Sequence, residues 1–335
     1  MTRRRSRLAG CALAVLASLA TLAVLEVGAR VWAARARDAA ERRPDVPLFI
    51  RRDATLGWRA MPDRDIALAP GRRFTTGRRG WRRYDDRGAR PLLVVVGDSY
   101  THAAGVADGA VYYDVLARRL DVGVAALAVN GYGTVQQWLV ARDAARELGR
   151  PAAMLLQATD NDPINNSLAL ERRSYLNNNL MPRPYLDDAG GAGLGDPRRL
   201  HERLVLGREV TRRGLAGRWP TIETAIEAGA PEALELYRRE VRHTGRALRL
   251  LRGVFPDVPA VAFNVGGSES RMARDLARLA REAGFRYVDV GPRLRAEARG
   301  REIFQDDGAH WNATGHAIAG DILTEALRAE LTARR

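Results

Sequence analysis

The stretch PLLVVVGDS, residues 91–99, carries the clearest indication of the fold. Its apolar residues run without a break up to Gly97, and a continuous apolar run of this kind is typical of a strand buried on both faces of a parallel sheet. Asp98 and Ser99 follow immediately. The stretch therefore predicts a central strand that presents an acid and a serine at its carboxyl end.

Apolar runs of the same kind recur along the chain and alternate with helical patterns. Further strands are predicted at 123–129, 152–158, 259–265 and 285–290. Helices are predicted at 111–120, 134–148, 232–252, 270–284 and 313–332. This alternation predicts an α/β fold with a central parallel sheet of about five strands, covered by helices on both faces.

The regions outside this pattern differ in composition. Residues 37–90 are rich in Arg, Asp, Pro and Gly, and we expect a juxtamembrane linker that packs loosely on the main domain, which covers 91–335. Residues 163–230 interrupt the alternation of predicted strands and helices, because they contain NNN, GGAGLG and several prolines. Such turn-forming residues predict a long insertion with local structure only.

An apolar segment follows the basic N-terminus. No charge occurs between Leu8 and Leu25, a length at the short end of the roughly 20 residues that span a bilayer as a helix. An extension of the helix includes Glu26 and Arg30, and an arginine side chain can reach the interface. We expect residues 1–36 to form a cytoplasmic tail and an uncleaved single-pass transmembrane anchor, with the rest of the chain exported.

Two other interpretations of this segment differ in strength. A cleaved signal peptide is an alternative, because Ala34-Arg35-Ala36 satisfies a small-x-small cleavage pattern. The anchor is preferred because the apolar run is long for a signal peptide. LAGC looks like a lipobox, but Cys11 precedes the apolar region instead of following it, so a lipobox is excluded.

The charge and cysteine content restrict the partners. The formal net charge of +14 comes from arginine, because the chain contains no lysine, and the arginines are spread from end to end. A nucleic-acid-binding protein instead gathers its charge on one helix or patch with interleaved aromatic residues. We therefore expect no nucleic-acid partner; attraction to anionic lipid or acidic polymer fits the charge. Cys11 is the only cysteine, which excludes an intrachain disulfide and a cysteine-based zinc site.

Polar residues gather where the predicted strands end. Ser99 follows the first strand, NGYG at 130–133 the second and DND at 160–162 the third, and DDGAH at 306–310 comes after the fifth. Ligands of open α/β sheets bind at the carboxyl ends of the strands. These four stretches are therefore expected to meet at one site.

Their residue types match the requirements of acyl transfer. A serine hydroxyl becomes a nucleophile when a base, usually histidine, takes its proton, and a carboxylate must hold the imidazole in one tautomer. Asp307 and His310 are close enough in sequence for one short loop to supply both groups. The backbone N–H groups of Ser99 and Gly131 and the side-chain amide of Asn161 are candidate donors to an oxyanion.

The four stretches resemble the sequence blocks of the SGNH (GDSL-type) hydrolase superfamily. GDS at 97–99 matches the first block, with Tyr100 where the family often has leucine. Gly131 matches the glycine of the second block, and DGAH at 307–310 matches the Asp-x-x-His of the last. The blocks occur in the family order within residues 91–332.

The third block departs from the family pattern. The family usually has Gly-x-Asn-Asp, whereas this chain has TDND at 159–162, with Ala158 or Thr159 in place of the glycine. LGW at 56–58 and the apolar N-terminus also look like a membrane-anchored bacterial subgroup often found among polysaccharide-modifying proteins.

The resemblance implies a fold and a set of roles. The fold is a flavodoxin-like three-layer α/β/α sandwich. Ser99 would be the nucleophile, His310 the base and Asp307 the acid that orients it. Gly131 and Asn161 would complete the oxyanion hole with the Ser99 N–H. The resemblance implies no metal and no organic cofactor.

Other polar and aromatic residues near the blocks have a structural interpretation beside the functional one. Asp160 and Asp162 could form a carboxylate pair for metal binding or acid–base catalysis, but a role in loop structure is the simpler interpretation. His316 is interpreted as a histidine within a helix whose hydrogen bonds are satisfied by the protein. His201 and His243 are interpreted as solvent-exposed surface residues. The candidates for the substrate pocket are Tyr100, His102, Tyr132, Asp162, Asn165, Asn166 and Trp311.

Three functions are compatible with the sequence. The first is a serine esterase outside the cytoplasm that removes acyl groups, in particular acetyl, from a cell-envelope carbohydrate or a similar ester. The second is an O-acyltransferase that passes the acyl group to a sugar hydroxyl, because the chemistry up to the acyl-enzyme is the same. The third is a non-catalytic envelope scaffold or carbohydrate-binding module with the same fold, which the presence of Ser99, His310 and Asp307 disfavours.

Overall fold

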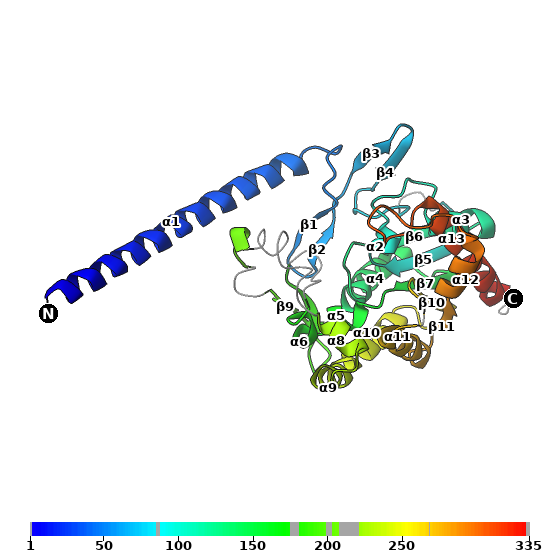
Figure 1. The fold of residues 1–335 in the computed structure, drawn as a ribbon. Coiled ribbons are helices and arrows are strands. Elements are labelled where there is room, and N and C mark those ends of the chain that lie inside the picture. Colours follow the sequence, from blue (N-terminus) through cyan, green and yellow to red (C-terminus); the bar gives the residue numbers. More distant parts are fainter. Residues whose placement is uncertain are drawn as a thin grey trace. The chain divides into compact units, whose positions relative to one another are not determined.

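A five-stranded parallel sheet forms the centre of the fold (Figure 1). The computed structural model of the chain describes residues 2–84, 88–174, 181–198, 203–207, 221–267 and 269–332. The strands of the sheet are β5 (Leu92–Gly97), β6 (Gly123–Ala128), β7 (Ala153–Ala158), β10 (Ala260–Asn264) and β11 (Arg286–Asp289). The predicted parallel sheet of about five strands is therefore confirmed.

The order of the strands creates a point where the chain changes direction across the sheet. The order is β11-β10-β7-β5-β6, with all neighbours parallel. The chain enters at β5, continues to the edge at β6, and then crosses back to β7 on the other side of β5. In open α/β sheets, ligands bind at such a switch point beyond the carboxyl ends of the strands. Here that position lies beyond β5 and β7.

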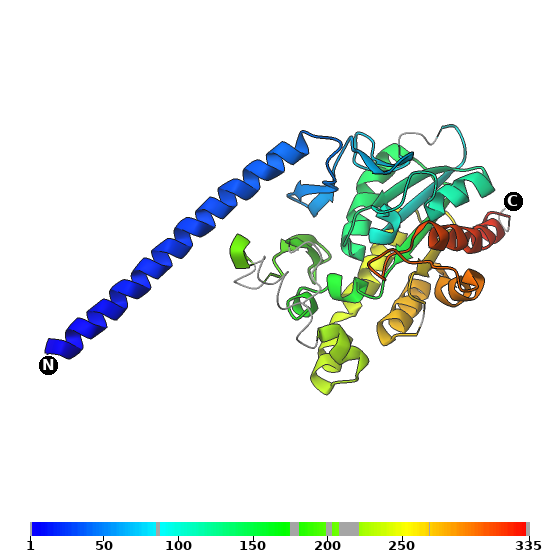
Figure 2. The same ribbon diagram turned by 45° about the horizontal axis from the view of Figure 1, so that its top comes forward.

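Helices cover both faces of the sheet. In β5, Val94 and Val96 join the apolar cluster on one face, whereas Leu93 and Val95 join the cluster on the other. All four side chains are at most 2% exposed, which explains why the apolar run has no polar interruption. One face is covered by α4 (Thr134–Leu148), α10 (Arg242–Arg252) and α11 (Arg271–Glu282). The other is covered by α3 (Tyr112–Leu120), α12 (Val290–Ala298) and α13 (Ala313–Thr332), of which α12 and α13 lie side by side in Figure 2.

Two helical regions differ from the sequence prediction. The helix expected at 232–252 is divided at Val241 into α9 (Pro231–Glu240) and α10. The division lets Tyr237 of α9 pack in a small separate apolar cluster while Leu248 of α10 packs on the sheet. The additional helix α12 was not expected, because its first turn contains Gly291 and Pro292. A proline is tolerated there because the first turn of a helix does not need its N–H.

Residues 44–84 are more ordered than the loosely packed linker expected from their composition. They form two antiparallel hairpins, β1 (Ile50–Asp53) with β2 (Gly57–Ala60) and β3 (Asp65–Ala69) with β4 (Arg72–Thr75). Trp58 and Phe74 are 0% exposed, and Trp58 shares an apolar cluster with the sheet residues Val94 and Leu127. Aromatic side chains bury a large apolar area, so these few residues suffice to fix the hairpins on the main domain.

The region expected as an insertion has local structure. It contains α5 (Asp162–Asn165), α6 (Leu168–Glu171), the hairpin of β8 (Arg183–Leu186) and β9 (Ala192–Gly195), and α8 (Ile222–Glu227). The NNN stretch at 177–179 and His201 lie outside the described residues.

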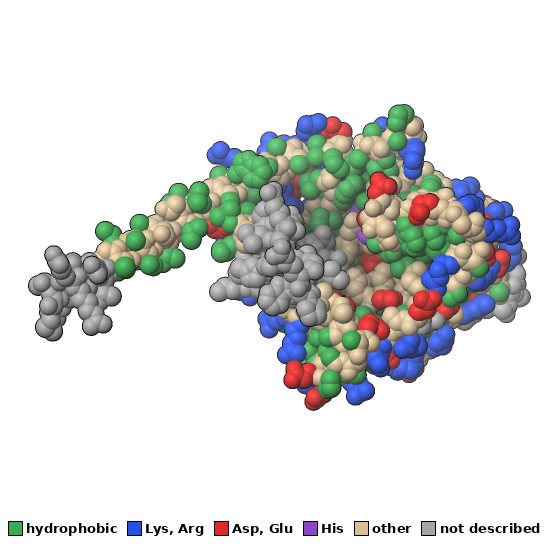
Figure 3. Space-filling view, in the orientation of Figure 1, with side chains coloured by type: hydrophobic (Ala, Val, Ile, Leu, Met, Phe, Trp, Pro, Cys, Tyr) green, Lys and Arg blue, Asp and Glu red, His purple; other side chains and the backbone are tan. Residues whose placement is uncertain are grey.

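Contacts divide the chain into two units, residues 1–43 with 198–219 and residues 44–197 with 220–335. The first contains α1 (Thr2–Glu41), whose exposed side chains include Leu13, Leu16 and Val24; Figure 3 shows apolar side chains along it. Its segment Gly10–Glu41 is long and apolar enough to cross a membrane, a test that a signal sequence also passes. The Glu26 carboxylate accepts from the Arg30 Nε and from the backbone N–H of Val205, at 2.8 and 2.9 Å.

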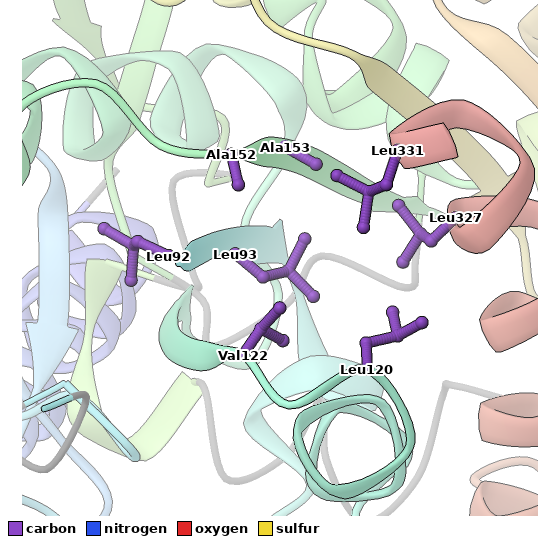
Figure 4. Close-up of a pocket in the computed structure, with 8 residues that line it drawn as sticks. All are labelled: Leu92, Leu93, Leu120, Val122, Ala152, Ala153, Leu327 and Leu331. Carbon is purple, nitrogen blue, oxygen red and sulfur yellow. The ribbon is translucent and has the colours of Figure 1, made fainter. Parts of the chain in front are cut away.

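A small void lies at the amino end of β5 and β7 (Figure 4). Leucine, valine and alanine side chains line it, including Leu93, Val122 and Ala153, and its volume is about 10 Å³. A space of this size holds at most about one water molecule. It lies at the opposite end of β5 from Ser99, so it is not part of the candidate site.

Candidate active site

Ser99 lies at the turn between β5 and the single-turn helix α2 (Ser99–His102). Asp98 caps this helix, because its Oδ1 accepts the backbone N–H of Tyr100 at 3.2 Å. Asp98 is only 2% exposed, and burial raises the pKa of its carboxyl despite the hydrogen bonds that it accepts. The turn leaves the Ser99 side chain half-buried at the carboxyl edge of the sheet.

A loop far away in the sequence brings His310 and Asp307 to Ser99. The His310 Nε2 lies 2.9 Å from the Ser99 Oγ, and the His310 Nδ1 lies 2.6 Å from the Asp307 Oδ2. An antiparallel bridge between Phe304 and Trp311 closes the loop that carries the two residues. The three side chains therefore form one continuous hydrogen-bonded chain.

The Asp307 carboxylate is held by its own loop. Its Oδ1 accepts the backbone N–H groups of Ala309 and His310, each at 2.9 Å. Its partial burial acts to raise the pKa, but these N–H groups and the His310 ring outweigh that effect and lower the pKa of Asp307 to about 2. The carboxylate is therefore ionised at neutral pH and fixes a proton on the His310 Nδ1. The Nε2 is then left to accept the Ser99 hydroxyl proton.

Three donors near the carboxyl edge have no acceptor among the described residues: the backbone N–H groups of Ser99 and Gly131 and the side-chain amide of Asn161. The Ser99 N–H is unpaired because it is the first N–H of α2, and the first N–H groups of a helix have no partner within it. The Asn161 Oδ1 accepts from the Thr159 hydroxyl, so its NH₂ group is the end that stays free. Unpaired donors are what an oxyanion requires.

Gly131 occupies the third position of a tight turn after β6. The Tyr132 N–H donates to the Val129 carbonyl at 3.1 Å, and Gly131 has φ +77°. Residues other than glycine rarely adopt a positive φ, which accounts for the glycine in NGYG. The hydrogen bond of the turn is made by the Tyr132 N–H, so the Gly131 N–H is not used within the turn.

The Tyr100 ring packs between the rings of His310 and Trp311. The Tyr100 ring centroid lies 5.1 Å from that of His310 and 5.0 Å from that of Trp311. The Tyr100 hydroxyl donates to the Ala309 carbonyl at 2.6 Å. These contacts tie the Ser99 turn directly to the loop that carries His310, and among the pocket candidates Tyr100 has the side chain nearest to the surface.

The other pocket candidates lie in the interior, which differs from the expectation that they line a substrate pocket. Each is at most 3% exposed: His102, Tyr132, Asp162, Asn165, Asn166 and Trp311. His102 donates from Nδ1 to the Asn130 Oδ1 at 2.7 Å, and burial lowers its pKa to about 4. Asp162 accepts the Thr159 N–H at 3.1 Å, and burial raises the pKa of its carboxyl. The burial of these side chains makes them supports of the loops at the carboxyl edge.

The remaining titratable candidates have structural partners. Asp160 binds the side chains of Asn264 and Ser270 and does not pair with Asp162. His316 is 1% exposed and stacks on Tyr112. Among the described residues, no group of three His, Cys, Asp or Glu side chains is arranged to hold a metal ion.

Sequence reasoning missed three side chains that support the loops of the site. Trp58, Thr159 and Arg183 contact the loops that carry Gly131 and Asn161. Thr159 was noticed only as a departure from the family pattern, and Trp58 only as part of LGW. Arg183 carries no local signal, because its burial depends on the packing of β8 against α4 and β2, which are distant in the sequence.

Comparisons with known proteins yield likenesses in fold. No family model and no curated protein matches the chain. The chain is similar to a solved carbohydrate esterase family 2 enzyme of Corynascus thermopiles (Myceliophthora fergusii), with 14% identity, 72% of this chain and 67% of that chain covered, and a TM-score of 0.37. A member of the lipolytic protein G-D-S-L family from Veillonella parvula has 11% identity, coverages of 71% and 98%, and a TM-score of 0.36. The lipase/acylhydrolase of Enterococcus faecalis has 14% identity, coverages of 71% and 96%, and a TM-score of 0.33.

Proposed function

We propose that the chain is a serine esterase in which Ser99 is the nucleophile. The observation that carries the proposal is the hydrogen-bonded chain from the Ser99 Oγ through His310 to Asp307, at 2.9 and 2.6 Å. Nucleophile, base and orienting acid within hydrogen-bond reach are the signature of an activated serine. The three unpaired donors at the same edge of the sheet support the same proposal.

The reaction follows from this arrangement. The His310 Nε2 takes the Ser99 proton as the Oγ bonds to the ester carbonyl carbon, and the carbonyl oxygen becomes an oxyanion. The N–H groups of Ser99 and Gly131 and the Asn161 amide stabilise that charge. The carbon–oxygen bond to the alcohol then breaks, and His310 returns the proton to the leaving alcohol. A water molecule, deprotonated by His310, hydrolyses the acyl-enzyme and releases the carboxylic acid and free Ser99.

The exposure of the site supports a short acyl group on a large polar alcohol. The side chains of His310 and Asp307 are 39% and 48% exposed, so the ester has to reach an open surface. A long acyl chain would instead need an apolar cavity that buries most of it. We therefore propose an acylated carbohydrate as the substrate class, in line with the resemblance of LGW and the apolar N-terminus to a subgroup often found among polysaccharide-modifying proteins. The apolar helix at Gly10–Glu41 supports a location of the site outside the cytoplasm.

The first test measures hydrolysis of p-nitrophenyl acetate by the full chain in detergent. Replacing the nucleophile leaves only binding and oxyanion stabilisation, so Ser99→Ala should lower kcat by at least about 10³-fold. Ser18→Ala, whose hydroxyl bonds only within α1, is the matched control and should keep the wild-type rate. Equal rates for the wild type and Ser99→Ala would refute the proposed function.

The substrate class is tested separately. The wild type should release acetate from acetylated oligosaccharides and should hydrolyse p-nitrophenyl palmitate more slowly than p-nitrophenyl acetate. A higher kcat/KM for the palmitate ester would contradict the proposed short acyl group while leaving the role of Ser99 intact.

A further inference from the structure

The indole of Trp58 is hydrogen-bonded to the loop that carries Gly131. Its Nε1 donates to the Asn130 carbonyl at 3.0 Å, and the Trp58 side chain is 0% exposed. The Asn130 carbonyl and the Gly131 N–H belong to the same peptide group. No described peptide bond is cis, and in a trans peptide the C=O and N–H point in opposite directions. By fixing the carbonyl, the indole fixes the direction of the N–H on the other side.

A second side chain fixes the next peptide of the same turn. The Arg183 Nη1 donates to the Gly131 carbonyl at 3.1 Å. The Arg183 guanidinium also lies over the Trp58 indole, 4.9 Å from the ring centroid. The Tyr132 hydroxyl closes the arrangement by donating to the Trp58 carbonyl at 2.9 Å. The carbonyls on both sides of the Gly131 Cα are thus bound by groups that also contact each other.

The arginine is anchored by a buried carboxylate. Arg183 and Glu171 form an ion pair at 3.0 Å in which both side chains are 0% exposed. The Tyr185 hydroxyl donates to the other Glu171 oxygen at 2.7 Å. Removing both charges from water is unfavourable, and apolar residues in such positions often give equal or greater stability. Stability alone therefore does not account for a charged pair beneath this turn.

We propose that Trp58, supported by the buried Arg183–Glu171 pair, is a positioning residue that aims the Gly131 N–H at the oxyanion. The proposal rests on the proposed esterase function. It gives the LGW segment a role in the reaction, although Trp58 is in a hairpin before the main domain and touches no reacting atom. His102 holds the Asn130 side chain from another direction, so the indole acts on the peptide itself.

The test uses variants that remove the indole donor and little else. Trp58→Phe removes the N–H and part of the ring, and Trp58→3-benzothienylalanine replaces the N–H by sulfur while keeping the ring size. Loss of one oxyanion donor lowers kcat by about 10²–10³-fold in a serine protease, so loss of its alignment should lower kcat on p-nitrophenyl acetate by at least about tenfold. KM should stay within about twofold, because the interaction forms with the oxyanion and not with the bound ester.

Trp138→Phe is the matched control. Trp138 lies in the same apolar cluster and is 8% exposed, but its indole donates to no described group, so kcat should stay near the wild-type value. The melting temperature of each variant shows whether a lower kcat results from unfolding or from misalignment of the Gly131 N–H. If Trp58→Phe does not fold, the isosteric 3-benzothienylalanine variant decides the outcome.

The outcomes separate the two proposals. If Ser99→Ala abolishes activity and Trp58→3-benzothienylalanine keeps kcat within about twofold of the wild type, the indole does not position the donor and this inference is overturned, while the esterase function stands. A change confined to KM would overturn it equally. A wild type without Ser99-dependent activity would remove the proposed function and this inference with it.

Discussion

At the scale of single residues, Thr159 directly precedes the stretch DND at 160–162 and connects two loops at the carboxyl edge of the sheet. Its hydroxyl donates to the Asp98 Oδ2 at 2.8 Å and also contacts the Asn161 Oδ1. Thr159 therefore links the turn that carries Ser99 to the loop that carries Asn161. The Asn161 NH₂ group has no acceptor among the described residues.

Removal of the Thr159 hydroxyl should therefore affect the oxyanion donor and not ester binding. We expect Thr159→Val, which keeps the shape of the side chain, to lower kcat on p-nitrophenyl acetate by roughly tenfold with little change in KM. Thr159→Ser keeps the hydroxyl and should retain most of the activity. Steady-state kinetics of the two variants provide the comparison, and equal kcat values would show that the hydroxyl does not orient Asn161.

At the scale of elements, the sequence predicts the strands of the sheet well. It predicts poorly the residues that support the loops of the candidate site. The strand that begins at Leu92 is recognisable because both of its faces are buried, which leaves an uninterrupted apolar run. That Ser99, His310 and Asp307 lie close together could be predicted, because the strand ends of a parallel sheet meet at one edge. The places of Trp58 and Arg183 could not, because their contacts join hairpins whose short strands have no distinctive period.

The contact between hairpin β1–β2 and the chain entering β8 is especially close. Gly57 has φ +80°, and a Cβ at this position would overlap the backbone carbonyl oxygen of Pro182. Gly71, between β3 and β4, has a similar φ of +70° but no atom within 4 Å of such a Cβ. The two glycines therefore separate the effect of the backbone angle from the effect of the contact.

Alanine at these two positions should have unequal effects on stability. Gly71→Ala should lower the free energy of unfolding by about 1–2 kcal/mol, because only the dihedral angle is strained. Gly57→Ala should lower it by roughly 2 kcal/mol more, since the backbone itself must shift. Urea denaturation of both variants measures the difference. Similar losses in the two variants would mean that the hairpin has room to move away from Pro182.

At the scale of the whole molecule, the groups of the proposed active site come from segments that the sheet order brings together. β5 and β7 are neighbours at the switch point, which places the loops of Ser99 and Asn161 side by side, and the loop before α13 adds His310. The same packing buries His316 of α13 against Tyr112 of α3. Burial, and then the charges of Arg82 and His310, lower the pKa of His316 to about 3.

The buried His316 should make stability depend on pH. Its pKa is lower in the folded chain than its ordinary value of 6.5, so between these values the unfolded chain binds the proton more readily. Its contribution to stability is thus complete above about pH 6.5 and declines as the pH falls toward the folded value. Between pH 7 and pH 5.5 the wild type should lose about 1 kcal/mol more than His316→Gln, which cannot be protonated.

The comparison between the two proteins is necessary because buried acids such as Asp162 respond to pH in the opposite sense. Urea denaturation of the wild type and His316→Gln at both pH values gives the four free energies. An identical pH dependence in the two proteins would show that the pKa of His316 is the same in the folded and unfolded chains.

The most direct measurement of the central claim is the covalent labelling of Ser99 by a fluorophosphonate, followed by intact-protein and peptide mass spectrometry. The reagent reacts with a serine whose proton is taken by a base, so its rate reports the Ser99–His310 pair. We predict one adduct on the wild type, located on the peptide that contains Ser99, absent in Ser99→Ala and formed at least about 10²-fold more slowly in His310→Gln. An unlabelled wild type, or an adduct that forms at the same rate in His310→Gln, would contradict the claim that His310 activates Ser99.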